Sequence, residues 1–512
     1  MYNIVVIKDY RKEISNMKSR TSGVLMHITS LPGEFGIGTF GREAYNFVDF
    51  LDETKQTYWQ LLPLTTTSYG DSPYQSFSAV AGNTNLIDFT LLAEQGLLDK
   101  DDYIDVNFGS NVEDIDYGLL FEVRRPILDK AVSKFLSIQD NITKLNDFRD
   151  KNRNWLVDYA EYMAIKEHFN HAALQKWPDL RAKNRDFNTL ERYRDTLKNV
   201  ILYYEVTQYF FFEQYLNLKK YANSKGIKII GDMPIYVSAD SVEMWTMPHL
   251  FKVDSNNEPL AVAGCPADDF SPEGQLWGNP LYNWEKHKET SYEWWIYRIE
   301  ESFKIYDVLR IDHFKGFSDY WQIDRNSQSA KYGSWQEGPG IELFEKIKER
   351  LGNLPIIAEN LGFIDAKAEK LLEDSGYPGM KILQFAFGGE DSFDLPHNYT
   401  ANSVAYTGTH DNDVINGWYE EQSEETKKYV DKYINRHKDE PITKAMLRTL
   451  YSSVSNTAIA TMQDLLDKDK SSRMNLPSTV GQNWRWRMKK EDLTQDKKEF
   501  LKEITILYKR ER

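Results

Sequence analysis

Eight short runs of apolar and β-branched residues recur along this chain, and polar segments with helical spacing separate most of them. The runs cover residues 23–29, 57–64, 227–232, 308–314, 354–361, 381–387, 403–407 and 458–466. Strand and helix patterns that alternate in this way require a parallel sheet, and eight repeats are the number that closes a barrel. The sequence therefore predicts an α/β fold, a (β/α)8 TIM barrel with helical subdomains inserted in its βα loops.

The spacing of the runs divides the 512 residues into a barrel and its insertions. Residues 90–225 are far longer than a βα connection, so they are expected to form an inserted, mainly helical subdomain. The barrel then comprises residues 21–89 and 226–512. Within it, residues 238–301 are a loop-rich insertion on the face where barrel active sites form. Residues 1–20 are an N-terminal leader.

Helical periodicity supports the inserted subdomain. Aromatic and apolar residues within 155–169 fall on one helical stripe, and residues 200–221 have an aromatic-rich helical pattern. Gly226 offers a left-handed cap that ends this helix directly before the third strand. In the leader, the pattern fits either a short helix or a flexible segment, and Met17 is an alternative start to Met1.

Charge and cysteine content restrict the partners of this chain. Its 63 Lys and Arg against 78 Asp and Glu give a net charge of -15. Such a charge repels nucleic acid and anionic membranes, and no basic patch offsets it, so neither is an expected partner. The single cysteine, Cys265, excludes an intramolecular disulfide and a cysteine-built zinc site. With no signal-like or membrane-spanning segment in the sequence, the expected location is cytoplasmic.

No cofactor and no metal are expected. Residues 36–41 match the spacing of a dinucleotide-binding loop. However, residues 30–35 separate this match from the preceding strand, and the next strand ends without an acid that could hold a ribose. His313, His410 and the nearby acids show no metal-ligand spacing.

Acidic residues stand at the ends of three of the runs: Asp312, Glu359 and Asp411. Arg310 lies two residues before Asp312 and thus on the same strand face, where it can hold Asp312 ionised as a nucleophile requires. Glu359 ends a buried run near other acids, which raises a carboxyl pKa and suits a proton donor. Asp411, next to His410, can bind sugar hydroxyls or oppose a positively charged transition state.

Each acid taken alone also permits a structural interpretation. Arg310 and Asp312 could form an ion pair that closes the end of the barrel, Glu359 could be a salt-bridged rim residue, and Asp411 could belong to an Asx-rich turn. The 13 Trp, 31 Tyr and 26 Phe give weak support for a carbohydrate partner, because aromatic rings stack on the apolar faces of sugars.

Blocks of sequence in a fixed order resemble the amylomaltases, which are 4-α-glucanotransferases that disproportionate maltodextrins. The resemblance runs from about residue 22 to the C-terminus, and its blocks are residues 27–33, 70–79, 231–236, 274–280, 310–314, 358–362, 408–413 and 473–477. It implies that Asp312 is the nucleophile, Glu359 the general acid/base and Asp411 the transition-state stabiliser. It also implies substrate-binding roles around the donor sugar and along the glucan for Arg310, His313, His410, Asp232, Ser72, Tyr74, Gln75 and Trp277.

The chain departs from the family pattern at three places. Asn360 follows the acid/base where the family usually has Asp, which affects the surroundings of Glu359. Residues 264–268 and 477–479 also differ from the usual motifs, and both lie in expected loops over the groove. None of these changes removes a predicted catalytic group.

The resemblance implies a retaining transferase that moves α-1,4-glucan segments between maltodextrin donors and acceptors. Two alternatives remain: an α-glucan hydrolase, and a non-catalytic glucan-binding protein on the same fold. Acceptor binding is expected along residues 251–284, where Phe270, Trp277, Tyr282 and Trp284 lie within a long loop. The sequence indicates no oligomeric state.

Overall fold

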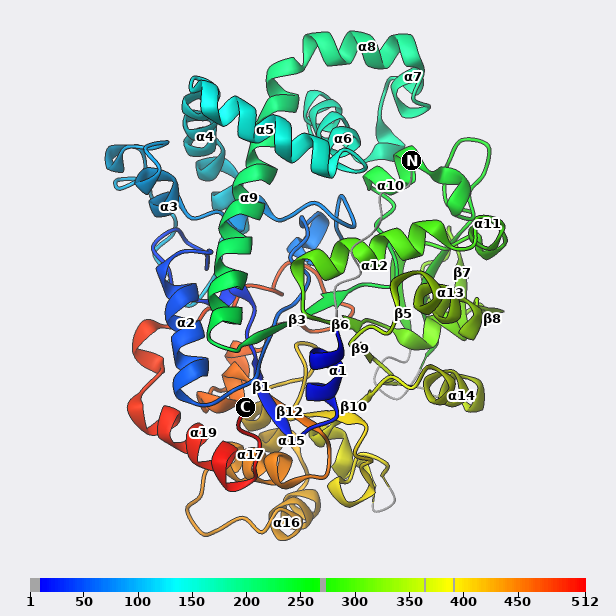
Figure 1. Cartoon of the computed structure of the whole chain (residues 1–512). Helices are drawn as coiled ribbons and strands as arrows, with labels where there is room; N and C mark the ends of the chain where they lie inside the picture. The colour runs from blue at the N-terminus through cyan, green and yellow to red at the C-terminus, as the bar shows by residue number, and fades with distance from the viewer. Residues whose placement is uncertain (1–9, 268–272, 363–364, 390–391) are drawn as a thin grey trace.

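A closed barrel of eight parallel strands forms the centre of the protein (Figure 1). The computed structural model describes residues 10–267, 273–362, 365–389 and 392–512. The strands are β1 (Thr21–Leu25), β2 (Tyr58–Gln60), β3 (Lys228–Met233), β6 (Val308–Ile311), β9 (Ile356–Ala358), β10 (Gly379–Ile382), β11 (Ser403–Tyr406) and β12 (Thr457–Thr461). Their order around the barrel is β1-β12-β11-β10-β9-β6-β3-β2. The prediction of a (β/α)8 barrel is confirmed, because the eight strands close a barrel and each overlaps one of the eight runs.

Most of the strands are shorter than the apolar runs that predicted them. Several runs continue past the strand into a helical turn: η1 (Ile28–Ser30) after β1, η8 (Leu383–Gly388) after β10 and α18 (Met462–Leu465) after β12. The residues of β1, β6, β9, β11 and β12 are all buried. Strands of a parallel barrel are covered on both faces, which is why they appear in the sequence as continuous apolar runs.

Amphipathic helices surround the barrel. In α13 (Ile341–Leu351), for example, Leu343, Phe344, Ile347 and Leu351 form one buried stripe. The other surrounding helices are α2 (Arg42–Glu53), α12 (Glu293–Ile305), α14 (Ala366–Ser375), α15 (Ile415–Glu421), α16 (Glu424–Tyr433), α17 (Ile442–Ser452) and α19 (Gln495–Leu507). The leader contains α1 (Arg11–Met17), whereas residues 1–9, with Met1, lie outside the described residues.

The segment between β2 and β3 folds mainly into helices, which form the upper part of the molecule in Figure 1. They are α3 (Phe89–Glu94), α4 (Tyr117–Leu136), α5 (Gln139–Asn152), α6 (Leu156–His168), α7 (Leu180–Lys183), α8 (Phe187–Thr196) and α9 (Lys198–Ser224). The long helix α9 packs against α4, α5 and α6 and leads back to the barrel. Gly226 follows it with a φ of +76°, the left-handed conformation expected from the sequence.

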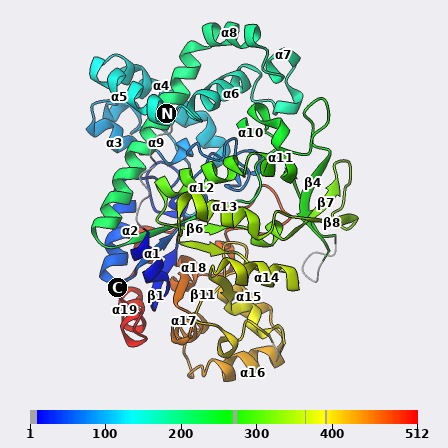
Figure 2. The same ribbon diagram turned by 45° about the vertical axis from the view of Figure 1, so that its right-hand side comes forward.

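A second, antiparallel sheet of four strands was not predicted. Its order is β5-β4-β7-β8, and it consists of β4 (Ala261–Cys265), β5 (Gln275–Pro280), β7 (Asp319–Asp324) and β8 (Gly333–Glu337). Figure 2 shows β4, β7 and β8 at the right of the molecule. The segment described from sequence as loop-rich therefore contains β4 and β5, together with the helices α10 (Val242–Thr246) and α11 (Trp284–Glu289).

Within the described parts of the chain, no helix combines the length and the apolar character needed to cross a bilayer.

Candidate active site

The three predicted acids stand beyond the carboxyl ends of three barrel strands. Asp312 follows β6, Glu359 follows β9 and Asp411 lies in the loop after β11. In the barrel, β6 and β9 are neighbours, and β10 separates β9 from β11. All three residues line one cleft with a volume of about 3310 Å³. Pockets for small molecules measure roughly 300–1,000 Å³, so this cleft has room for an extended, polymeric ligand.

Arg310 is a buried cation beside these acids. The barrel register pairs Arg310 on β6 with Asp232 on β3. Arg310 Nη1 donates to both Asp232 oxygens at 2.7 Å and to Asp312 Oδ1 at 3.0 Å. Burial disfavours the charged guanidinium, but the carboxylates of Asp232 and Asp312 outweigh it and raise the pKa of Arg310. Arg310 therefore stays charged and favours ionised carboxyls around it.

Asp312 lies at the surface of the cleft, with 26% of its side chain exposed. Burial raises the pKa of Asp312 well above its usual range, and Asp232, Glu359 and Asp411 add to this effect. The direct ion pair with Arg310 acts in the opposite direction, since it stabilises the carboxylate form.

Glu359 is nearly buried and accepts two backbone N–H groups. The N–H of His313 donates to Oε2 at 2.6 Å, and the N–H of Leu361 donates to Oε1 at 2.7 Å. His313 has a φ of +48°, a left-handed conformation at the start of the turn η7 (Phe314–Phe317). Burial raises the pKa of Glu359, and this effect exceeds the opposing contributions of Arg310 and the two amides. A raised pKa is the property that a proton donor needs.

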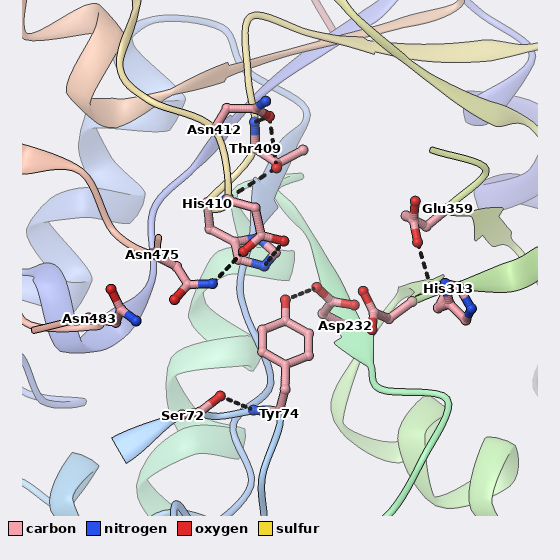
Figure 3. A network of polar contacts seen from close by, with 12 residues as sticks. Ser72, Tyr74, Asp232, His313, Glu359, Thr409, His410, Asn412, Asn475 and Asn483 are labelled. Atoms are coloured by element: carbon pink, nitrogen blue, oxygen red, sulfur yellow. Dashed lines mark hydrogen bonds and ion pairs between the residues drawn. The ribbon is translucent and has the colours of Figure 1, made fainter. Parts of the chain in front are cut away.

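Asp411 is fixed by residues of the C-terminal segment. Asn475 Nδ2 donates to Asp411 Oδ1 at 2.6 Å, and Arg473 Nη2 donates to the Asp411 backbone oxygen at 2.7 Å. His410 Nε2 lies 3.4 Å from Asp411 Oδ2. Burial lowers the pKa of His410, so its imidazole is neutral at neutral pH. Figure 3 shows Asn475 and His410, the two side chains that contact this carboxyl group.

Asp232 lies beneath the cleft surface instead of on it. Its side chain has no exposed area. Its carboxylate oxygens accept hydrogen bonds from Arg310 and from the Tyr74 hydroxyl, the latter at 2.7 Å (Figure 3). Asp232 lines a second cavity of about 450 Å³, which it shares with Tyr74. The sequence placed Asp232 around the donor sugar, and in the structure it supports Arg310 and Tyr74, which line the cleft themselves.

The other predicted binding residues line the same cleft. Tyr74 stacks on His410, with ring centroids 5.1 Å apart and planes at 14°, and Trp277 packs edge-on against His313 at 4.8 Å. Burial lowers the pKa of His313 to about 4. The predicted residues that line the cleft are Ser72, Tyr74, Gln75, Trp277, Arg310, His313 and His410.

Ser72 and Gln75 shape the loop that carries Tyr74. Ser72 Oγ accepts the backbone N–H of Tyr74 at 3.2 Å. Gln75 Nε2 donates to the Trp277 backbone oxygen at 3.2 Å and to Asn279 Oδ1 at 3.0 Å. Gln75 thereby connects the loop after β2 to β5, so two distant segments form one wall.

Two further residues of the cleft, Asn475 and Trp484, were not predicted from the sequence. Trp484 lies 5.7 Å from the rings of both Tyr74 and His410. The block at residues 473–477 marked Asn475 as part of a family motif, but its contact with Asp411 needed the structure. No local pattern indicated Trp484.

The aromatic segment expected to bind the acceptor is mostly core. Phe251 and Tyr282 are buried, and Trp284 packs against both Tyr282 and Trp295. Phe270 lies outside the described residues. Of the four aromatics named from sequence, Trp277 lines the cleft.

Carboxylates at the ends of barrel strands, arranged along an extended cleft, are the architecture of enzymes that act on glycosidic bonds. A family model described as 4-alpha-glucanotransferase matches residues 26–494. The 4-alpha-glucanotransferase of Streptococcus pneumoniae is 55% identical over 496 residues, which cover 96% of this chain and 98% of the relative. That of Clostridium butyricum is 48% identical over 489 residues and is covered completely. The chain therefore belongs to the 4-alpha-glucanotransferase family.

Solved structures agree with this assignment. An amylomaltase from Streptococcus agalactiae, solved in complex with acarbose, is similar with a TM-score of 0.95 and 62% identity, over 96% of this chain and 100% of that chain. The amylomaltase of Corynebacterium glutamicum has a TM-score of 0.77 at 17% identity, which shows a shared fold.

Proposed function

We propose that this protein carries out the 4-α-glucanotransferase reaction of its family by a retaining double displacement, with maltodextrins as donor and acceptor. The observation that supports the residue roles is the convergence of Asp312, Glu359 and Asp411 on one cleft, with Arg310 bound directly to Asp312. The proposal includes a cytoplasmic location.

In the first step, Asp312 attacks the anomeric carbon of an α-1,4-linked glucose unit in the donor. The direct ion pair with Arg310 opposes the effect of burial and favours the ionised form of Asp312, and Glu359 gives its proton to the leaving oxygen. The glycosidic C–O bond breaks while a bond to Asp312 forms. The product is a β-linked glycosyl-enzyme and a shortened glucan with a free 4-hydroxyl.

In the second step, Glu359 acts as a base. It takes the proton from the 4-hydroxyl of an acceptor glucan, whose oxygen then displaces Asp312 from the anomeric carbon. Two inversions restore the α-1,4 bond. Asp411, held by Asn475, faces the positive charge that develops on the sugar in both transition states.

The transferase and hydrolase alternatives differ in the molecule that intercepts the intermediate. A thousandfold preference for sugar over water requires only about 4 kcal/mol. A cleft of about 3310 Å³ extends well beyond one sugar ring and can bind an acceptor glucan before water attacks. This supports transfer.

The test uses maltotriose and the variant Asp312→Asn. The native protein should redistribute chain lengths among maltodextrins with retention of the anomeric configuration, and its release of new reducing ends should be slow. Asp312→Asn should lose turnover and keep measurable glucan binding. Exclusive hydrolysis would favour the hydrolase, and full activity of Asp312→Asn would exclude Asp312 as the nucleophile.

A further inference from the structure

Trp335 is an aromatic residue of the cleft that none of the roles above uses. It lies on β8, an edge strand of the antiparallel sheet, and lines the cleft. Its exposed fraction is 38%. A large indole that is exposed at the wall of a binding cleft offers a ligand an apolar surface and a polar N–H. Aromatic side chains of this kind commonly line ligand-binding sites.

The neighbours of Trp335 hold its ring in place. Lys315 Nζ lies 4.4 Å from the ring centroid. Lys315 is itself fixed, because it is 4% exposed and forms ion pairs with Asp319 at 2.7 Å and Asp365 at 2.8 Å. Trp321 packs against Trp335 with centroids 5.2 Å apart and planes at 67°. A ring restrained in this way loses little further freedom when a ligand binds.

The connections of Lys315 place Trp335 on the side of the cleft that carries the proton donor. Lys315 belongs to η7, which begins next to His313, and the His313 N–H holds Glu359. Asp365, the second partner of Lys315, caps α14. Residues after Glu359 and on α14 line the same cleft as Trp335; they are Asn360, Leu361, Ala368, Glu369 and Leu372.

The reaction mechanism indicates that the acceptor binds on the side of the cleft that carries Glu359. In the double displacement, Glu359 meets the oxygen that joins the donor sugar to the leaving group, and later the hydroxyl of the acceptor. The leaving group and the acceptor therefore occupy the part of the cleft that extends past Glu359. Trp335 and α14 form walls of that part.

We propose that Trp335 is a platform on which a glucose ring of the acceptor glucan stacks. The proposal rests on the transfer reaction proposed above and adds to it a residue that selects the acceptor. The C–H face of a pyranose is flat and apolar, so it can cover the exposed part of the indole while its hydroxyls face polar groups such as Glu369. Stacking of this kind favours interception of the intermediate by glucan over water.

The experiment is an acceptor titration with Trp335→Ala. Amylose at saturating concentration is the donor, and radiolabelled maltotriose is the acceptor. The KM for maltotriose should rise about tenfold, which corresponds to about 1.4 kcal/mol. The rate at which new reducing ends appear reports hydrolysis, whose acceptor is water, and should change by less than about twofold. Trp335→Phe keeps a flat ring and should retain most of the affinity.

Tyr332→Ala is the matched control. Tyr332 lies three residues before Trp335, is 75% exposed, and is not among the described residues that line the cleft. Its replacement should leave the KM for maltotriose unchanged. An unchanged KM in Trp335→Ala would overturn the inference, and so would an equal loss of transfer and hydrolysis with a lower melting temperature. Neither result affects the outcome of Asp312→Asn, so the failure of each proposal can be distinguished.

Discussion

Asn360 shows how a single residue can tune the proton donor. It follows Glu359 directly, and its side-chain oxygen accepts the backbone N–H of Met380 at 2.6 Å. The amide thus connects the end of β9 to β10 without adding a charge. A carboxylate at this position could accept the same hydrogen bond, but it would place a negative charge next to Glu359.

The variant Asn360→Asp should therefore change the pH dependence of activity. An added negative charge disfavours the ionised form of Glu359 and raises its pKa further. The alkaline limb of kcat/KM, which reports loss of the proton from Glu359, should move to higher pH by about half a unit to one unit. The measurement is a pH profile of maltotriose disproportionation.

Asn326→Asp serves as the control for this charge change, because Asn326 is exposed and lies in a turn of the antiparallel sheet. It adds the same charge at an exposed turn, at a residue that is not among those that line the cleft, and should leave the profile unchanged. An alkaline limb that stays in place or moves to lower pH in Asn360→Asp would contradict the assignment of Glu359 as the proton donor.

At the scale of elements, Asp464 fixes the loop that carries His410 and Asp411. Asp464 is 1% exposed. Its Oδ2 accepts the hydroxyls of Thr407 and Thr461 at 2.6 Å, and its Oδ1 accepts the N–H of Ile415 at 2.8 Å. Thr407 follows β11, Thr461 ends β12 and Ile415 begins α15. One carboxylate thus holds both ends of the loop between Thr407 and Ile415.

Asp464→Asn should lower kcat more than it changes KM. The amide nitrogen cannot accept a hydrogen bond, so at least one of the three donors loses its partner, at a cost of about 1–3 kcal/mol. The loop then positions Asp411 less well, and kcat for maltotriose should fall about tenfold or more. The measurements are steady-state kinetics and the free energy of unfolding in urea.

Asp307→Asn is the control for a buried acid elsewhere in the barrel. Asp307 precedes β6, at the opposite end from the site, and accepts the Ile229 N–H at 3.0 Å. Its replacement should reduce stability and leave kcat unaffected. If Asp464→Asn likewise reduced stability and left kcat unchanged, Asp464 would have no role in positioning Asp411.

The barrel strands could be predicted because buried parallel strands appear as continuous apolar runs. The second sheet could not be predicted from this signal. Its edge strands, β5 (Gln275–Pro280) and β8 (Gly333–Glu337), are short, contain Gly or Pro, and are only partly buried. Their residues resemble those of a loop.

The presence or absence of a buried apolar run also explains which site residues could be predicted from the sequence. Asp312 and Glu359 stand directly at the ends of apolar runs, so local sequence reveals them. Trp484 and Asn475 reach the site through long-range backbone contacts, such as the Asn475 N–H that donates to the His410 oxygen at 3.0 Å. Trp335 lies on a strand that sequence did not reveal. Contacts of this kind depend on tertiary packing, which leaves no periodic signal.

At the scale of the whole molecule, Asp240 attaches the helical insertion to the barrel. Asp240 lies in the segment after β3. Its Oδ1 accepts the Tyr162 hydroxyl at 2.6 Å and the Leu174 N–H at 2.8 Å, and its Oδ2 pairs with Lys166 Nζ at 2.6 Å. Lys166 is 3% exposed. Because Lys166 and Asp240 also line the cleft, this attachment forms part of the wall along which a long glucan lies.

Asp240→Ala should leave the Lys166 ammonium buried without its carboxylate partner. Loss of one member of a buried ion pair costs about 3 kcal/mol, so the free energy of unfolding should fall by about that amount. Urea unfolding followed by far-UV circular dichroism and by tryptophan fluorescence should give two midpoints that no longer coincide, because the helical insertion would open before the barrel.

In the control Asp129→Ala, an exposed ion pair with Arg125 is lost, and stability should change by less than about 1 kcal/mol. A single, unshifted transition in Asp240→Ala would mean that the insertion is held by its apolar contacts alone.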